Sequence, residues 1–334
     1  MPARIISQAE VNQLLAMPAC VDLMDQTLRT LTRGGAVLPL RTMLRLPDGR
    51  GVFGSMPAYL NPPDAIGLKA LTVFPGNEGT RFDSHQGVVL LFEATHGALT
   101  AILDASSVTA IRTAAVSGVA TRALANPDAG DLAILGSGVQ AVTHLDAMAA
   151  VRTLRRVRVY SRNAANVARF IKDTAGRHGV TAEAVDSVEA ALHGADLICT
   201  VTSARQPIVE RRWVADGAHL NVVGASLPGA REIDSDTVAV ARLYADRRES
   251  LLNESGDFLT PKSEGRFGDE HLLGEVGEVL EGKAPGRLGR SDITMFKSLG
   301  LAIEDLASAH YVAARAAELG IGTVIEIGGL RHED

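Results

Sequence analysis

One stretch decides the fold: Asp131-Leu132-Ala133-Ile134-Leu135-Gly136-Ser137-Gly138-Val139-Gln140-Ala141. The apolar residues 132–135 predict a short, buried parallel strand. Residues 136–141 fit the G-x-G-x-x-G/A turn of a dinucleotide site. The helical pattern that follows, up to Val151, would offer N–H groups and a positive dipole end to phosphates. This strand, turn and helix together predict that the stretch binds a dinucleotide.

Each small residue of the turn has a separate expected role. Gly136 would permit the tight turn, and Gly138 would let a pyrophosphate approach the backbone. Ala141 would let the helix pack closely on the strand. Glycine-rich turns are common, so the motif gains its weight from lying between a strand pattern and a helix pattern.

The composition excludes several classes of function. The 334 residues are 46% hydrophobic and 22% charged, as in a soluble globular protein of one or two domains. The net charge of -6 and the lack of a basic run argue against a nucleic-acid partner. No apolar run is long enough to span a membrane, and the N-terminal residues lack a signal-peptide pattern. We therefore expect a cytoplasmic protein without a membrane partner.

Cysteine and histidine usage gives no sign of a disulfide or a metal centre. The two cysteines, Cys20 and Cys199, cannot form a disulfide framework and suit a reducing compartment. The nine histidines lack the spacing of a zinc site. No metal site is expected.

The chain before the glycine turn is predicted to be mixed in structure. Residues 7–16 and 18–31 have helical patterns, and Ser7 with Glu10 forms a capping-box signal. Short strands follow between residues 37 and 103, and Pro47-Asp48-Gly49 marks a hairpin turn. A long helix of small residues, 106–125, ends at Asn126-Pro127, which we interpret as the domain junction.

After the junction, strand and helix patterns alternate. Strands are predicted at 132–135, 156–160, 195–201 and 218–224, with helices at 141–150, 164–178 and 187–192. Residues 265–289 look irregular or partly helical, and 303–319 form a last helix. This alternation predicts an α/β protein with a Rossmann-type, doubly wound dinucleotide-binding domain, preceded by an α+β substrate domain. We expect the site in the cleft between the two domains.

The end of the second Rossmann strand bears on the choice of cofactor. NAD sites usually place an acidic residue there, whereas NADP sites use arginine and small polar residues. The sequence has Ser161-Arg162-Asn163 at this point. NADP(H) is therefore favoured and NAD(H) remains possible. The alternative is that Arg162 merely caps a surface loop.

Several polar residues interrupt apolar segments of the substrate domain. Arg112 interrupts a small, apolar helix, and its forked guanidinium suits a carboxylate. Lys69 interrupts a strand, where an inward lysine is costly unless it is used. Arg41 and the Ser84-His85-Gln86 segment are further candidates. The alternative is that each of these residues faces solvent or a structural acid.

At these residues the sequence resembles the ornithine cyclodeaminase/μ-crystallin family, and within it the ketimine reductase (Δ1-pyrroline-2-carboxylate reductase) branch. The resemblance extends over nearly the whole chain. The matching segments are 39–42, 54–59, Lys69, 84–86, 110–115, 136–141, 222–226, 254–257 and 296–300. The resemblance implies a homodimer joined through the β-rich domain, to which the C-terminal helix also belongs. The domains are then expected at 1–125 with 304–334, for substrate and dimerisation, and at 126–303 for NAD(P).

The resemblance also implies roles for individual residues. Arg41, Lys69 and Arg112 match the catalytic cluster that holds the substrate carboxylate. The remaining expected substrate contacts are Met56, Ser84, His85 and Ser226. The expected cofactor contacts are Thr113, Gly136, Ser137, Gly138, Val139, Gln140, Ser161, Arg162, Asn163, Thr200, Val201, Thr202, Ser203, Gly224, Ala225, Ser226, Ser298, Leu299 and Gly300.

One departure from the family pattern separates its branches. Cyclodeaminases and the related archaeal alanine dehydrogenases carry an aspartate two residues before a Pro-Gly pair, where this chain has Ser226. A serine is neither a carboxylate base nor a partner for a developing iminium charge. The expected activity is therefore NAD(P)H-dependent reduction of a cyclic α-imino acid, such as Δ1-pyrroline-2-carboxylate to proline. Lys69 would supply the proton directly or through water, or tune the field around the imine. An ornithine cyclodeaminase, another amino-acid dehydrogenase and a non-catalytic binder of NADPH and a small ligand remain as alternatives.

Overall fold

The computed structural model describes residues 2–77 and 79–329, which form two compact units. Unit 1 comprises Met1–Arg112 and Leu301–Asp334, and unit 2 comprises Thr113–Gly300. The division falls within helix α3 (Ala105–Leu124), whereas the predicted boundary follows this helix, at residue 125. The outer ends of the predicted first domain, residues 1 and 334, and Glu78 within it lie outside the described residues. Arg112 thus groups with unit 1, and Thr113 groups with unit 2.

Unit 1 is built on a mixed sheet whose strand order is β16-β1-β7-β6-β5-β4-β2, with β3 also paired to β4. The predicted hairpin around residues 47–49 is confirmed, because β3 and β4 pair antiparallel. The N-terminal strand and the last strand were not predicted, and they pair with each other at the sheet edge. The strands are β1 (Pro2–Ile6), β2 (Ala36–Val37), β3 (Thr42–Arg45), β4 (Val52–Leu60), β5 (Ala65–Val73), β6 (His85–Glu93), β7 (Leu99–Asp104) and β16 (Thr323–Glu326).

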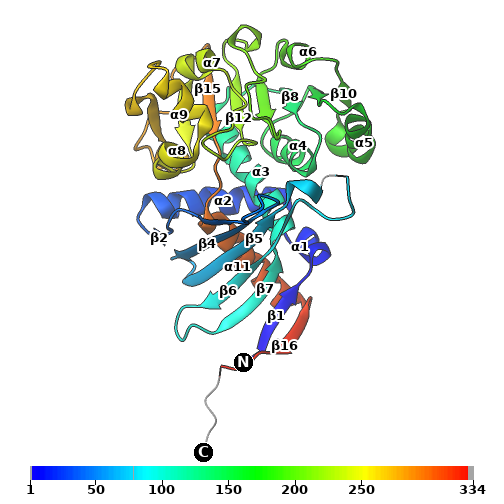
Figure 1. The fold of residues 1–334 in the computed structure, drawn as a ribbon, viewed down its shortest axis with the longest axis vertical. Helices are drawn as coiled ribbons and strands as arrows, with labels where there is room; N and C mark the ends of the chain where they lie inside the picture. Colours follow the sequence, from blue (N-terminus) through cyan, green and yellow to red (C-terminus); the bar gives the residue numbers. More distant parts are fainter. Residues whose placement is uncertain (1, 78, 330–334) are drawn as a thin grey trace, which may run out of the picture. The chain divides into compact units, whose positions relative to one another are not determined.

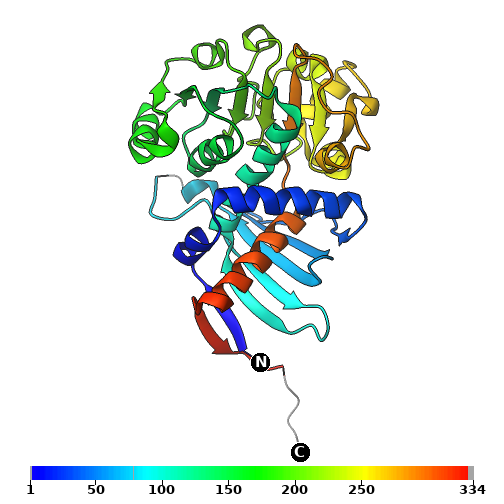
Figure 2. The same cartoon turned by 180° about the vertical axis from the view of Figure 1, so that it is seen from behind.

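One face of this sheet is covered by helix α11 (Ala302–Leu319), which crosses β4, β5 and β6 (Figure 2). The approach is so close that a Cβ on Gly67 of β5 would lie 2.6 Å from Leu306 Cδ1 of the helix. Helices α1 (Gln8–Leu14) and α2 (Met17–Thr32) also pack against α11. The capping box predicted for α1 is confirmed, since the Ser7 backbone N–H donates to Glu10 Oε2 at 2.7 Å.

Unit 2 is a parallel sheet with the order β10-β9-β8-β11-β12-β15-β13-β14 (Figure 1). Its first five positions reproduce the 3-2-1-4-5 order of a Rossmann domain, so the predicted doubly wound fold is confirmed. The strands are β8 (Asp131–Leu135), β9 (Arg156–Tyr160), β10 (Ala182–Ala184), β11 (Leu197–Thr200), β12 (His219–Val222), β13 (Arg242–Ala245), β14 (Leu272–Glu275) and β15 (Thr294–Lys297). The helices are α4 (Val139–Val151), α5 (Ala164–Thr174), α6 (Val188–Leu192), α7 (Ser235–Val240), α8 (Arg248–Glu254), α9 (Gly256–Ser263) and α10 (Val276–Leu280).

Two predicted segments of unit 2 need correction. Helix α5 ends at Thr174 rather than at residue 178, because Gly176 adopts a φ of 75° that a helix cannot continue through. The partly helical character predicted for residues 265–289 is confirmed by α10, whereas the strand β14 in the same segment was not predicted. The strand β14 has only four residues, two of them buried, which is too short for a clear period.

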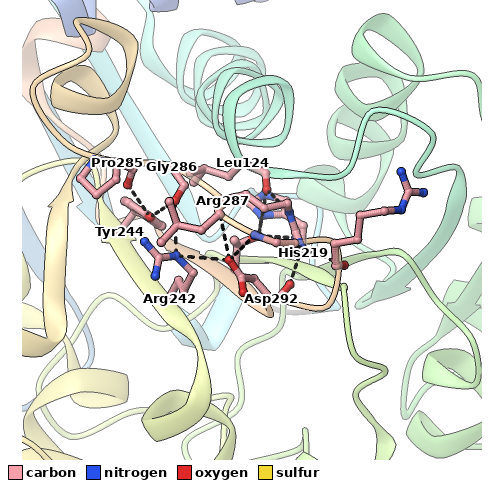
Figure 3. A network of polar contacts seen from close by, with 12 residues as sticks. Leu124, His219, Arg242, Tyr244, Pro285, Gly286, Arg287 and Asp292 are labelled. Atoms are coloured by element: carbon pink, nitrogen blue, oxygen red, sulfur yellow. Dashed lines mark hydrogen bonds and ion pairs between the residues drawn. The ribbon is translucent and has the colours of Figure 1, made fainter.

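A polar network joins the amino ends of the unit 2 strands to the end of α3 (Figure 3). Arg287 lies at its centre, where Nε donates to the Leu124 carbonyl at 2.8 Å and Nη2 donates to Thr294 Oγ1 at 2.9 Å. Tyr244 Oη donates to the Pro285 carbonyl at 2.7 Å. The network satisfies a carbonyl at the C-terminus of α3 and lies at the sheet edge opposite the glycine turn, which indicates a structural role.

Two further features of the described residues concern membrane-spanning helices and cysteine thiols. Within residues 2–77 and 79–329, no helix is both long and apolar enough to cross a membrane. Cys20 and Cys199 are free and buried. Burial raises the pKa of each thiol to about 12, so neither is a reactive thiolate at neutral pH.

Candidate active site

Lys69 is buried in the centre of the unit 1 sheet. On β5 it pairs with Met56 of β4 and Val89 of β6, so these side chains share the face that α11 covers. Only 4% of the Lys69 surface is exposed. Its Nζ lies 2.6 Å from Asp305 Oδ2 and donates to Thr109 Oγ1 at 3.4 Å. The strand alternation therefore turns a lysine into the interior, where a carboxylate compensates its charge.

Arg112 is held by two carboxylates from the first turn of α11. Its Nε donates to Asp305 Oδ1 at 2.9 Å, and its Nη1 donates to Glu304 Oε2 at 2.7 Å. All three side chains are buried. Glu304 also accepts from the Leu301 backbone N–H at 3.1 Å, which ties it to the start of the helix. We refer to Lys69, Arg112, Glu304 and Asp305 as the buried charge cluster.

The charges of the cluster shift the pKa values of its members. Burial lowers the pKa of Lys69 to about 8, against the opposing pull of Asp305, and the positive charges of Arg112 and Arg41 add to the lowering. Burial alone would raise the pKa of Asp305, but Arg112 and Lys69 outweigh it and hold that pKa below its ordinary value. At neutral pH Asp305 is therefore a carboxylate, and Lys69 is close to its titration range.

The other predicted substrate residues of unit 1 lie near this cluster to different degrees. Met56 is buried as the cross-strand neighbour of Lys69. Arg41 lies just before β3, close enough for its charge to act on Lys69. His85 begins β6, and Ser84 Oγ is 3.0 Å from its Nδ1. Loss of hydration and the charge of Lys69 lower the pKa of His85, so its imidazole is neutral at pH 7.

Glu304 and Asp305 are members of the buried charge cluster that were not predicted from the sequence. The alternative that Lys69 and Arg112 face a structural acid is confirmed, since both contact Asp305. A usable signal was present, because two adjacent acids stand in the first turn of an alanine-rich helix. Acids near a helix N-terminus are common, however, and the sequence alone did not connect them to Lys69 and Arg112, which precede them by 192–236 residues.

The predicted nucleotide residues of unit 2 gather at the carboxyl edge of its sheet. Gly136 follows β8 with a φ of 117°, and its N–H donates to the Tyr160 carbonyl at the end of β9. A Cβ at this position would lie 2.7 Å from the carbonyl oxygen of Val201, which follows β11. The turn thus sits where the strand order reverses between β8 and β11, the point at which open α/β sheets bind ligands.

The start of α4 fits a phosphate group. Gly138 is the N-cap of this helix, and a Cβ placed on it would meet no atom within 4 Å. Its missing side chain therefore leaves open space beside the backbone of Ser137, Val139 and Gln140, as a pyrophosphate requires. Val139 is 64% exposed, which is unusual for a valine. Ala141 is fully buried, as its packing role requires.

The loop after β9 has one residue with a structural role. Asn163 caps α5, since its side chain accepts from the Asn166 backbone N–H at 3.2 Å. Ser161 is half-buried and Arg162 is exposed. Because Asn163 caps α5, Arg162 has no capping role at the start of this helix.

The loops after β11 and β12 are fixed by one buried carboxylate that was not predicted. Glu232 accepts from Thr200 Oγ1 at 2.8 Å, and from the Thr202 backbone and hydroxyl at 2.8 and 2.6 Å. It also accepts from the Gly224 N–H at 2.8 Å. The Thr200 and Thr202 side chains are thus occupied by Glu232. Val201 is half-buried and Ser203 is exposed on the same loop.

Further buried charges support the last predicted nucleotide residues. Lys297 Nζ donates to the Ala225 carbonyl at 2.5 Å and pairs with Asp257, whose carboxylate lies 3.0 Å away. Asp246 Oδ2 accepts from the N–H groups of Leu299 and Gly300 at 2.6 and 2.7 Å.

The remaining predicted cofactor residues differ in burial. Ser298 is buried, and Ser226 is half-buried after Ala225. Thr113, in α3, is also buried. Among the described residues, no group of three or more His, Cys, Asp or Glu is placed to hold a metal ion.

Comparisons with known proteins agree with this arrangement. The ornithine cyclodeaminase/mu-crystallin family model matches residues 2–320. A ketimine reductase mu-crystallin of Mus musculus is 39% identical over 279 residues, which are 84% of this chain and 85% of the mouse protein. The structure of Thermococcus litoralis Delta(1)-pyrroline-2-carboxylate reductase, in complex with NADH and L-proline, has a TM-score of 0.93 and 35% identity, covering 96% of this chain and 99% of that chain. An archaeal alanine dehydrogenase dimer with bound NAD has a TM-score of 0.92 and 29% identity, covering 98% of this chain and 100% of that chain. The chain therefore belongs to the ornithine cyclodeaminase/mu-crystallin family.

Proposed function

We propose that the protein reduces a cyclic α-imino acid, such as Δ1-pyrroline-2-carboxylate, to the amino acid with NAD(P)H. The observation that carries the proposal is the pairing of Lys69 and Arg112 on a shared carboxylate, inside a family member with a dinucleotide turn. A titratable ammonium beside a fixed guanidinium suits a substrate that has a carboxylate next to a C=N bond. The names of the mouse and Thermococcus relatives support the same reaction.

Each cation has a separate part in the proposed reaction. Arg112, together with Arg41, binds the substrate carboxylate, and the bonds from Arg112 to Asp305 and Glu304 fix its plane. A guanidinium has five N–H donors, of which these two bonds use two. Lys69 donates a proton from Nζ to the imine nitrogen as the C=N carbon is reduced. A bound nicotinamide supplies the hydride.

For the cofactor, we propose a preference for NADPH. The support is the absence of an acid after β9 and the exposed Arg162 in its place. The structures of the Thermococcus and archaeal relatives contain NADH and NAD. The proposed NADPH preference therefore rests on the residues after β9 of the present chain and not on these relatives. Ser137, Gly138 and the start of α4 would hold the pyrophosphate, and the loops fixed by Glu232, Lys297 and Asp246 would hold the nicotinamide.

One set of assays tests the function. Purified protein is given Δ1-pyrroline-2-carboxylate with NADPH or NADH, pyruvate and ammonia with each cofactor, and separately L-ornithine with NAD. The expected result is oxidation of the reduced cofactor with one proline formed per turnover. Proline from ornithine without net cofactor turnover would instead identify a cyclodeaminase, which Ser226 argues against. Rapid turnover of pyruvate and ammonia alone would identify an open-chain amino-acid dehydrogenase.

We also propose that the protein is a homodimer joined through the unit 1 sheet. The face opposite α11 is apolar yet uncovered: Phe53, Ile66 and Val88 are 43%, 40% and 37% exposed. The register places Phe53 beside Thr72 at one end of β5, Val88 beside Ala70, and Ile66 beside Phe92 at the other end. The half-buried Leu68 and Leu90 lie between them on the same face, so the apolar surface extends along β5. Apolar patches of this kind mark protein interfaces. The dimeric archaeal relative supports a second copy as the partner.

A further inference from the structure

Asp305 is the one residue of the buried charge cluster that contacts both cations of the proposed site. Its Oδ2 is 2.6 Å from Lys69 Nζ on β5, and its Oδ1 accepts from Arg112 Nε on α3 at 2.9 Å. Glu304, its neighbour on α11, bonds Arg112 through Nη1. Asp305 is 1% exposed, so water does not screen either contact strongly.

We propose that Asp305 is a positioning residue of the reductase site, which holds the Lys69 ammonium in its charged form and sets the plane of the Arg112 guanidinium. One carboxylate would thereby control both the proton donor and the group that binds the substrate carboxylate. This inference rests on the proposed function for its catalytic meaning. The ion pairs on which it stands belong to unit 1 alone.

The surroundings of Lys69 show why a carboxylate is needed. Arg112 and Arg41 are positive and disfavour a charge on Lys69, as does its burial. Thr109 is a neutral hydrogen-bond partner from α3, and His85 of β6 is neutral at pH 7. Asp305 is the group that opposes these effects. Without its negative charge, Lys69 would lose its proton at a lower pH and would be a poorer donor at neutrality.

Asp305 also explains how Arg112 keeps a fixed orientation. Asp305 accepts from Nε and Glu304 accepts from Nη1, so the two acids hold two of the three guanidinium nitrogens. A substrate carboxylate bound by Arg112 would then meet donors of fixed direction, which aligns its C=N bond. The Asp305 carboxylate also contacts Lys69, so it fixes the distance between the Lys69 ammonium and the Arg112 guanidinium as well.

The decisive experiment measures the titration of Lys69 directly. The chain has five lysines, so selective 13C labelling gives few Cε signals, and Lys69→Arg identifies the Lys69 signal. We compare the wild type with Asp305→Asn, which keeps the shape but removes the charge. Glu304→Gln is the matched control, because Glu304 is the adjacent acid and bonds Arg112. The remaining lysine signals report whether each variant is folded.

The proposal predicts that the Lys69 titration moves down by about one pH unit or more in Asp305→Asn. The basic limb of the kcat profile for imine reduction should move by the same amount, because protonated Lys69 is the active form. Glu304→Gln should raise KM for the imino acid more than tenfold while moving the Lys69 titration much less. If Asp305→Asn fails to fold, Asp305→Glu replaces it: its retained charge should keep the limb in place while the longer side chain lowers kcat/KM.

Failure of the inference and failure of the proposed function give different results. An unchanged Lys69 titration in folded Asp305→Asn overturns the inference, whatever the activity. If the basic limb of the kcat profile moves equally in Asp305→Asn and Glu304→Gln, the inference is also overturned, because the effect is then not specific to Asp305. If the Lys69 titration shifts in Asp305→Asn but the wild-type protein reduces no imino acid, the effect of Asp305 on Lys69 is supported and the proposed reductase function is refuted.

Discussion

Gly136 and Val201 approach so closely that a single added carbon would make them collide, because a Cβ on Gly136 would stand 2.7 Å from the Val201 carbonyl oxygen. The φ of 117° at Gly136 is strained for any other residue as well. Gly138, two residues later, differs in both respects: its φ is negative and a Cβ there would meet no atom within 4 Å. The two glycines of the turn therefore serve different purposes.

Alanine substitutions should separate these purposes. Gly136→Ala should destabilise the protein by about 1–3 kcal/mol, because alanine is strained at this backbone conformation. Gly138→Ala should leave the melting temperature near that of the wild type and weaken NADPH binding at least tenfold, because the methyl group occupies the space of the pyrophosphate. Calorimetry and NADPH fluorescence titration measure the two effects. Normal NADPH affinity in Gly138→Ala would refute the assignment of this turn to the cofactor.

Arg162 should determine the choice between the two cofactors. Arg162→Asp removes a cation that suits the 2′-phosphate and adds an acid that suits the ribose hydroxyl. We expect the ratio of kcat/KM for NADPH to that for NADH to fall by at least tenfold. Arg169→Asp is the control, since Arg169 is an exposed arginine farther along α5. Equal changes in the two variants would show a general charge effect instead of recognition at the ribose.

The proposed proton donor predicts a pH dependence. Lys69 is charged below its pKa of about 8 and neutral above it. The rate of imine reduction should therefore be retained below that pH and fall as the pH rises through it. Lys69→Arg keeps a positive charge but cannot release a proton in this range, so we expect kcat to fall about 10²–10⁴-fold. A stopped-flow profile of hydride transfer would contradict the assignment if Lys69→Arg kept the wild-type rate.

Arg112 should affect binding of the substrate more than folding when its charge is kept. Arg112→Lys retains a cation for Glu304 and Asp305 but loses the planar fork. KM for the imino acid should rise at least tenfold with a small change in melting temperature. Arg112→Ala would leave two buried carboxylates without this cation and should cost about 3–5 kcal/mol of stability. Wild-type KM in Arg112→Lys would argue against a carboxylate-binding role.

The proposed dimer can be tested at the uncovered sheet face. Ile66→Lys places a charge within the patch, and we expect the protein to become monomeric in sedimentation or light-scattering measurements. Val240→Lys is the control, because Val240 is 54% exposed on α7 of unit 2 and lies outside the patch. A dimer that survives Ile66→Lys would place the interface elsewhere.

Most of the fold could be predicted because its signals are local. The strand at 156–160 and the helices around 105–124 and 302–319 have long periodic patterns or clear boundaries. The strands β13 and β15 were missed because each has four residues, almost all buried, and resembles any short apolar run. The helix at α5 was overextended because a sequence does not reveal that Gly176 has a positive φ.

The candidate site was predictable only where a residue contradicts its surroundings. Lys69 and Arg112 stand out in apolar segments, and their burial is as expected. Their partners did not stand out, because acids in the first turn of a helix are ordinary. Glu232 was missed for a related reason: its value lies in four hydrogen bonds to loops that precede it by 8–32 residues. Such contacts arise from topology and leave no local pattern.

The place of Asp305 in the chain bears on the order in which the protein is made. Unit 2 is continuous from Thr113 to Gly300 and is complete on the ribosome before α11 exists. Lys69 and Arg112 have by then been synthesised, and Asp305 follows Arg112 by 193 residues. Until α11 emerges, these two cations lack their carboxylates and the sheet lacks its cover. All residues of unit 2 are therefore synthesised before the helix that covers the unit 1 sheet, and the same helix supplies the last two members of the charge cluster.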